Sequence, residues 1–256
     1  MSAESEKELQ QMKKRFRELA DKCYMQNVYC FTDFLGMAEL DVFYGMEREL
    51  SHVPSRVYGG GVCSERQMVR FGSEEMLGYD LPFPIACLYI RPLSEKFADR
   101  LTHRDFLGAC MHLGIERSTL GDIVTEASGA YLYCVERIAP YIMEHLVKIK
   151  HTSVTCGLCG EEIKPPQPRL ERREYQVSSE RLDGVIARAM GLSREKSTLL
   201  FRERRVSVNG RLQEQASCTP RKGDIISVRG HGKFVYHGLS HMTRKGKCNI
   251  VVEFYV

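Results

Sequence analysis

The sequence of 256 residues predicts an α+β protein in three parts. Helical periodicity dominates the N-terminal part, strand and helix patterns alternate in the middle part, and two short helix patterns precede short strands in the last part. A proline-rich segment sets the last part apart. We expect a helical N-terminal region at 1–75, a middle domain at 76–163, a linker at 164–174 and a small α+β domain at 175–256.

The composition excludes several classes of protein. Apolar residues make up 43% of the chain, which is enough for sizeable cores, and no run approaches the roughly 18 apolar residues of a membrane span. The first residues, MSAESEKELQQMKKRF, are polar and hold no signal-peptide core. The ten cysteines show no paired spacing and are most simply reduced thiols. We therefore expect a cytoplasmic protein.

The N-terminal region begins with an amphipathic helix from Lys7 to Gln26, and a second helix is expected from Ala38 to about Leu50. The glycine run that follows, Gly59–Gly61, raises the question of a phosphate-binding loop. It lacks both the Gly-Lys-Ser/Thr ending of a nucleotide loop and the G-x-G-x-x-G spacing of a dinucleotide site. A structural turn is the better interpretation.

The middle domain shows the order strand, helix, strand, strand, helix, strand. Thr102 is placed to cap the first helix, with Asp105 in its first turn. This β-α-β-β-α-β order is that of the ferredoxin-like sheet, which RNA-recognition domains share. The expected elements are 83–90, 103–113, 120–125, 131–135, 138–149 and 152–156.

Three tyrosines of this sheet, Tyr89, Tyr131 and Tyr133, allow two interpretations. They stack bases on an open face, or they pack as structural residues. The aromatic consensus of RNA-recognition domains is not met, so we favour packing.

Cys156 and Cys159 have the spacing of a zinc knuckle. A structural zinc ion needs four ligands, and no second pair of cysteines or histidines follows closely. We expect no metal site and no cofactor, with these two cysteines as weak candidates only.

The C-terminal domain begins with two short helices. Apolar residues recur at i, i+3, i+4 and i+7 from Leu182, and Gly191 ends this first helix. Ser193 is placed to cap a second helix that runs to about Arg205. A short strand, the turn Asn209-Gly210 and a strand from Ile225 follow.

Positive charge is concentrated in residues 181–234. This stretch holds twelve Lys and Arg against five Asp and Glu, a net charge of +7, whereas the whole chain carries +4 and the remainder therefore −3. At about 100° per residue, Arg194, Arg202 and Arg205 fall on one face of the second helix. A basic face beside an acidic remainder is typical of a polyanion binder. The alternative is a solvated helix surface, which we disfavour because the charges share a face.

The same stretch resembles a known RNA-binding domain, the S-four domain named for small-subunit ribosomal protein four. The resemblance rests on RLD-x-VIA, LSR, V-x-VNG and KGD-x-I-x-VRG-x-GKF, with the spacing kept throughout. One position departs from the pattern. Arg204 stands where members of the family carry a glycine that ends a helix in a left-handed turn, at a cost on the order of 1 kcal/mol.

From about Arg15 to Tyr255, nearly its whole length, the chain resembles the YlmH-like RNA-binding proteins. The segments FTDFL, GGG…ER, FPI…L-x-I-x-P, KFADRLTHRDFLGACMHLGI and LGDIV carry this resemblance. It implies a middle domain like RNA-recognition domains, association with the ribosome, and a role in ribosome-associated quality control, the rescue of stalled large subunits that hold peptidyl-tRNA. The family's genes also tend to lie among cell-division genes, which implies a division role.

The resemblance implies a non-enzymatic protein that binds ribosomal RNA and tRNA on the large subunit. We expect no membrane partner, no small-molecule substrate and a monomer. Arg181 and Arg194 should carry most of the phosphate contact. The other expected RNA-binding residues are Ser193, Lys196, Arg202, Arg205, Asn209, Lys222, Arg229, Lys233, Arg244 and Lys245.

Two rival functions stay open. S-four domains are often appended to RNA-modifying enzymes, but we find no cofactor fingerprint and no catalytic Asp motif in residues 1–175. The second rival is an adaptor for the division machinery, in which the acidic N-terminal part binds a protein.

Overall fold

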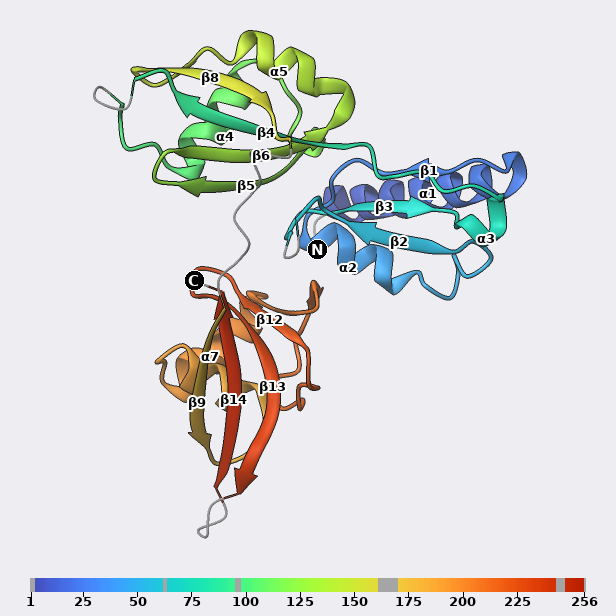
Figure 1. Ribbon diagram of the computed structural model, residues 1–256. Coiled ribbons are helices and arrows are strands. Elements are labelled where there is room, and N and C mark those ends of the chain that lie inside the picture. Colours follow the sequence, from blue (N-terminus) through green and yellow to red (C-terminus); the bar gives the residue numbers. More distant parts are fainter. Residues whose placement is uncertain (1–2, 62–63, 95–97, 161–169, 243–246, 256) are drawn as a thin grey trace. The chain divides into compact units, whose positions relative to one another are not determined.

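The computed structural model describes residues 3–61, 64–94, 98–160, 170–242 and 247–255 (Figure 1). The chain forms two compact units, Met1–Gln167 and Pro168–Val256. Helices and strands are both abundant in the described residues, which agrees with the predicted α+β class. No helix in these ranges is long and apolar enough to cross a membrane. The finer division into three parts stays a prediction.

The N-terminal region combines helices with a small sheet, so the expectation of a helical region was incomplete. Its three strands pair in the order β1-β3-β2, and all pairs are antiparallel. The strands hold two to four residues each, which is too short for an alternating pattern to show in the sequence. The elements are α1 (Ala3–Gln26), β1 (Cys30–Phe31), α2 (Met37–Gly45), β2 (Ser55–Tyr58), β3 (Met68–Phe71) and α3 (Glu74–Leu77).

Aromatic packing joins these helices to the small sheet. The rings of Phe16 in α1 and Phe43 in α2 meet edge to face with centroids 5.6 Å apart, and Phe43 lies 6.0 Å from Phe71 in β3. All three side chains are buried. Edge-to-face pairs add to the free energy that burial itself contributes.

The middle part of the first unit contains the predicted order of strands and helices. Its sheet has the order β5-β6-β4-β8-β7 with antiparallel neighbours, which places the first predicted strand at the centre. The second helix is shorter than expected, because residues 148–149 leave it and pair with β8. The elements are β4 (Ile85–Pro92), α4 (His103–His112), β5 (Leu120–Glu126), β6 (Gly129–Val135), α5 (Ala139–His145), β7 (Lys148–Ile149) and β8 (Thr152–Leu158), with 3-10 turns at Arg117–Thr119 and Glu136–Ile138.

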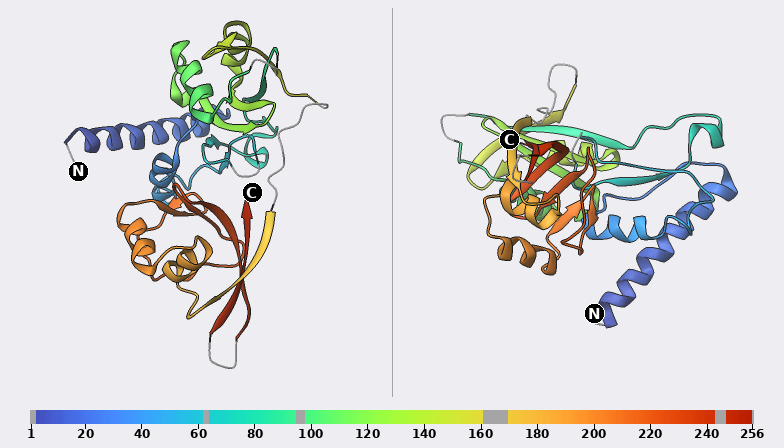
Figure 2. Two further views of the ribbon diagram at one scale, coloured as in Figure 1. Left: turned by 90° about the vertical axis from the view of Figure 1, so that its left-hand side faces the viewer. Right: turned by 90° about the horizontal axis from the view of Figure 1, so that it is seen from below.

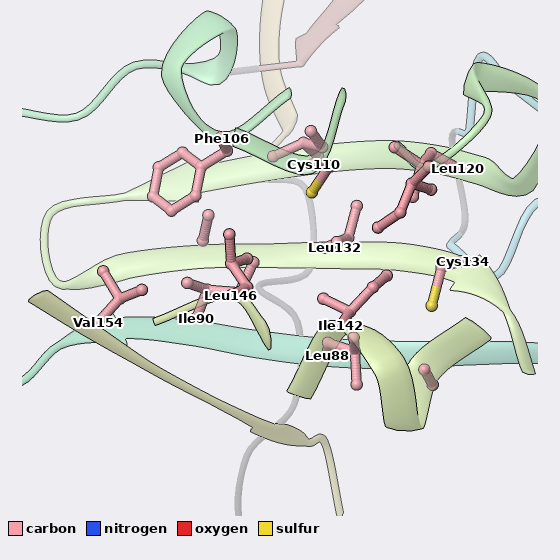
Figure 3. Close-up of a cluster of buried hydrophobic side chains, with 14 of the residues drawn as sticks. Leu88, Ile90, Phe106, Cys110, Leu120, Leu132, Cys134, Ile142, Leu146 and Val154 are labelled. Atoms are coloured by element: carbon pink, nitrogen blue, oxygen red, sulfur yellow. The ribbon is translucent and has the colours of Figure 1, made fainter. Parts of the chain in front are cut away.

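Both helices of this part pack on one face of the sheet. Figure 3 shows Phe106 of α4 and Ile142 of α5 in one buried cluster with Leu88, Ile90 and Leu132 of the central strands. These side chains are at most 2% exposed. The apolar alternation of the central strands therefore has a complete cover on this face.

Part of the opposite face of the sheet is covered by the N-terminal region. Phe34 and Met68 pack against Tyr133 and Val135 of β6. Gly60, with a φ of +92°, lies against the same tyrosine, and a Cβ there would come within 2.3 Å of the Tyr133 ring. The glycine run is thus a structural turn, as the sequence indicates.

The second unit is a six-stranded antiparallel sheet with two helices against it. The strand order is β11-β10-β12-β13-β14-β9, and β13 and β14 form a long hairpin (Figure 2). The elements are β9 (Leu170–Val177), α6 (Leu182–Ala189), α7 (Arg194–Arg202), β10 (Val206–Val208), β11 (Arg211–Leu212), β12 (Ile225–Val228), β13 (Gly232–Met242) and β14 (Cys248–Tyr255).

Strand β9 corrects the expected linker at 164–174, because residues 170–174 pair with β14 along the full strand. The sequence of β9, LERREYQV, is almost entirely exposed. A charged edge strand lacks the apolar alternation by which strands are recognised. The rest of that linker up to 169 and the turn residues Arg244 and Lys245 lie outside the described residues.

Candidate nucleic-acid interface

The two helices of the second unit are built by the local signals that the sequence shows. The apolar residues of α6, from Leu182 to Ala189, are buried in the core with Leu200 and Phe201 of α7. Gly191 has a φ of +65° and lets the chain reverse between the helices. The Ser193 hydroxyl caps α7 by accepting the backbone N–H of Lys196 at 3.2 Å.

This arrangement places Arg181 and Arg194 at the starts of the two helices, where both side chains turn to one carboxylate. Arg181 donates to the Asp183 carboxylate through Nε at 3.2 Å and through a terminal nitrogen at 3.1 Å. Arg194 donates through Nε at 3.4 Å to the same carboxylate. The arginine side chains are 47% and 55% exposed, whereas that of Asp183 is 5% exposed.

The ionised form of Asp183 is favoured despite its burial. Burial alone raises the pKa of this carboxyl. The hydrogen bonds from Arg181 and from the Gly184 backbone N–H, at 2.8 Å, and the charge of Arg194 outweigh burial, so the pKa lies below its ordinary value. The site is therefore one buried anion with two half-exposed cations.

A further buried contact fixes the two helices to each other. Ser197 of α7 is fully buried, and its hydroxyl donates to the backbone carbonyl of Asp183 at 2.8 Å. We did not select Asp183 from the sequence as a functional residue. Asp183 belongs to the RLD motif, so the sequence did mark it. A count of net charge nevertheless passes over it, because an acidic residue lowers the positive charge of a phosphate-binding face.

The remaining basic residues of the two helices face solvent. Lys196 and Arg202 are exposed, as is Arg188 near the end of α6. Arg188 and Arg194 line one hollow of about 420 Å³, whose apolar part includes Val177 and Leu192. Arg188 was not predicted from the sequence, because it lies on α6 and the basic pattern was recognised on α7.

Two of the predicted residues are engaged within the fold. Arg205 donates to the backbone carbonyl of Arg229 through two nitrogens, at 2.7 and 3.2 Å. Asn209 has a φ of +52° and closes its turn by donating to Asp224 and accepting the N–H of Ile225, both at 2.8 Å. Both residues therefore shape the strands beside the helices, and their contact with RNA stays a prediction.

The flanking residues differ in their surroundings. Lys222 and Arg229 are exposed. Lys233 is half-buried, with its Nζ 5.3 Å from the centre of the Tyr255 ring. The structure thus brings together Arg181, Ser193 and Arg194 around the starts of the two helices.

The cysteine pair and the tyrosines of the first unit are weaker candidates for a binding site. Cys156 packs into the core that the helices cover, whereas Cys159 lies by Cys87, which packs against the opposite face of the sheet. Side chains on opposite faces cannot share one metal ion, and no cluster of three potential ligands occurs among the residues that the structure describes.

Tyr131 and Tyr133 are each 6% exposed, which confirms that they are packing residues.

Comparison with known proteins finds a family model that matches the middle part and two similar proteins. Residues 82–159 match the family described as "Putative RNA-binding domain in YlmH". A Bacillus subtilis (strain 168) protein named ribosome-associated protein quality control protein P2 is 28% identical over 223 residues, which is 87% of this chain and 86% of the relative. The solved cell division protein YlmH from Streptococcus pneumoniae aligns with a TM-score of 0.49 and 21% identity, over 62% of this chain and 93% of that one.

Proposed function

We propose that this protein binds structured RNA of the large ribosomal subunit, and tRNA held there, through the α6–α7 face and without catalysing a reaction. The observation that carries the proposal is the pair of half-exposed arginines, Arg181 and Arg194, joined to one buried carboxylate. The face lies in the stretch of the chain with a net charge of +7. Such a face neutralises phosphates.

The mode of recognition follows from the chemistry of the face. Guanidinium groups bind phosphate oxygens with two parallel hydrogen bonds, which fixes the position of the RNA backbone. Lys196 and Arg202 extend the positive surface along α7. Contacts of this kind carry no base information, so the RNA is recognised by the shape of its A-form helix.

The ribosomal setting of the proposal is supported by two similarities. Residues 82–159 match an RNA-binding family, and the relative from Bacillus subtilis is named as a ribosome-associated quality control protein. We propose that this chain acts in the same setting, as a cytosolic monomer on obstructed large subunits, and that its second unit is an S-four-type RNA-binding domain. Because the N-terminal region covers the part of the middle sheet around Tyr133 and Val135, the middle part would meet RNA through its remaining surfaces.

The proposal is tested by co-sedimentation with purified large ribosomal subunits over a series of salt concentrations. We compare the wild type with the Arg181→Ala/Arg194→Ala double variant. The matched control is Arg48→Ala/Arg56→Ala, which removes two exposed arginines of the first unit outside residues 82–159 and changes the net charge equally. Each lost phosphate contact flattens the slope of log affinity against log salt by roughly 0.7–0.9.

The expected result is weaker and less salt-dependent binding for the first double variant and nearly normal binding for the control. Equal losses in both variants would show that net charge alone matters. An affinity that changes neither with salt concentration nor with the Arg181→Ala/Arg194→Ala substitutions would contradict the proposal and favour a protein partner.

A further inference from the structure

Asp183 poses a problem for a phosphate-binding face. Its carboxylate is a negative charge at the centre of the face, and its side chain is 5% exposed. A buried charge costs free energy unless it is well paired. A carboxylate near phosphates also repels them. A favourable interaction must therefore offset both the free energy of burying the carboxylate and its repulsion of phosphates.

The contacts of the carboxylate point to what it does. Its hydrogen bonds come from Arg181, from Arg194 and from the Gly184 backbone N–H of its own helix. A second contact between α7 and α6, from Ser197, goes to the backbone carbonyl of Asp183 and not to its side chain. The two helices also share a buried apolar core. The carboxylate therefore orients the two arginines, while Ser197 and the apolar core also join the helices.

Each arginine keeps donors for a ligand. A guanidinium has five N–H groups. Arg181 gives Nε and one terminal nitrogen to Asp183, and Arg194 gives only Nε. About half of each side chain is exposed, so the remaining donors face solvent. An arginine fixed before binding loses less side-chain entropy when it meets a phosphate.

We propose that Asp183 is a positioning residue that holds Arg181 and Arg194 ready as a pair of phosphate ligands, so that a negative charge on the face strengthens RNA binding. The proposal rests on the proposed function and names the residue that organises its site. It predicts a sign opposite to that of simple electrostatics. Removing a negative charge from a phosphate-binding face would by charge alone tighten binding.

The test uses the full chain and two probes, a short A-form RNA duplex measured by fluorescence anisotropy and purified large ribosomal subunits measured by co-sedimentation. Asp183→Asn is compared with Glu195→Gln. Both substitutions remove one negative charge, and Glu195 is exposed on α7. We expect Asp183→Asn to weaken duplex binding about tenfold and Glu195→Gln to leave it unchanged or slightly tighter. Duplex binding by Asp183→Asn that equals or exceeds that of the wild type would overturn the proposal.

A double-variant cycle separates positioning from a merely structural role. In the Arg181→Ala/Arg194→Ala background, Asp183→Asn should cause no further loss of affinity, because the groups it orients are gone. A further tenfold loss there would show that Asp183 acts through the fold, and would refute the proposal.

A second substitution covers the case in which Asp183→Asn fails to fold. Arg181→Lys keeps the charge but cannot make the two-nitrogen contact with Asp183. It should weaken duplex binding severalfold, whereas Arg172→Lys, at an exposed arginine of β9 in the same unit, should not. Equal affinities for the two lysine variants would count against positioning.

The RNA duplex and the ribosomal subunits, used as separate probes, distinguish the positioning role of Asp183 from the proposed ribosomal function. A wild type that binds the duplex but not ribosomal subunits would contradict the ribosomal function, while the duplex measurements still decide the role of Asp183. A wild type that binds neither probe would overturn both.

Discussion

Arg66 fixes the N-terminal region to the middle sheet, and its removal should separate them. Its guanidinium donates to the backbone carbonyls of Leu120 at 2.9 Å, Phe34 at 2.7 Å and Arg117 at 3.2 Å. The backbone N–H of Arg66 itself donates to Asp122 at 3.1 Å. We predict that Arg66→Met, which keeps the aliphatic length, destabilises this junction.

The magnitude follows from these contacts. Hydrogen bonds from charged groups contribute about 1.5–3 kcal/mol each. Burial lowers the pKa of Arg66, although Glu39 and Asp122 act to raise it, so the cost of burying the charge offsets part of the sum. We expect a net loss of about 3 kcal/mol, which corresponds to opening roughly 150 times more frequent.

The assay is hydrogen exchange read by mass spectrometry on the full chain. Peptides from β1 and β5 should exchange faster in Arg66→Met, while peptides from β9 and β14 in the second unit serve as an internal reference. The control is Arg56→Met, since Arg56 is exposed on β2. Exchange in Arg66→Met that matches this control would refute the reasoning.

Two further predictions concern backbone conformation and pH. Arg204 has a φ of +55°, so Arg204→Gly should be more stable than Arg204→Ala by about 1 kcal/mol in urea unfolding of the second unit, and equal stabilities would show that the left-handed turn costs nothing. The Lys150 ammonium, 2.8 Å from the Asp105 carboxylate, and the Thr102 N–H and hydroxyl lower the pKa of Asp105 to about 2. A carboxyl with a lowered pKa stabilises the fold above its unfolded pKa of 3.8 and loses that effect as the pH falls towards 2. Asp105→Asn should therefore lower the melting temperature at pH 7, with a difference from the wild type that shrinks between pH 4 and pH 2; a difference that is constant with pH would contradict this assignment.

Features that depend on neighbouring residues were predictable from the sequence. The cap at Ser193 and the turn at Asn209 each follow from residue types within a few positions, and both are found. The left-handed conformation of Arg204 was expected because the S-four pattern has glycine at that place. Local backbone preferences decide the first two, whereas an arginine disfavours the third, which the resemblance indicated.

Features that depend on distant pairing were not predictable. Strand β9 pairs Leu170 with Tyr255, and β1 pairs Cys30 with Phe71, so neither strand has a partner near it in the sequence. Short or charged strands gain their stability from that partner and not from their own composition. The role of Asp183 in the candidate site was not predictable either, because it depends on contact with Arg194, eleven residues away.

The central claim is that the α6–α7 face meets ribosomal RNA or tRNA. The most direct measurement is an electron cryo-microscopy map of the full chain bound to large ribosomal subunits. We predict density in which Arg181 and Arg194 contact RNA phosphates beside Asp183. A map in which the protein is bound through its first unit, with α6 and α7 facing solvent, would contradict it.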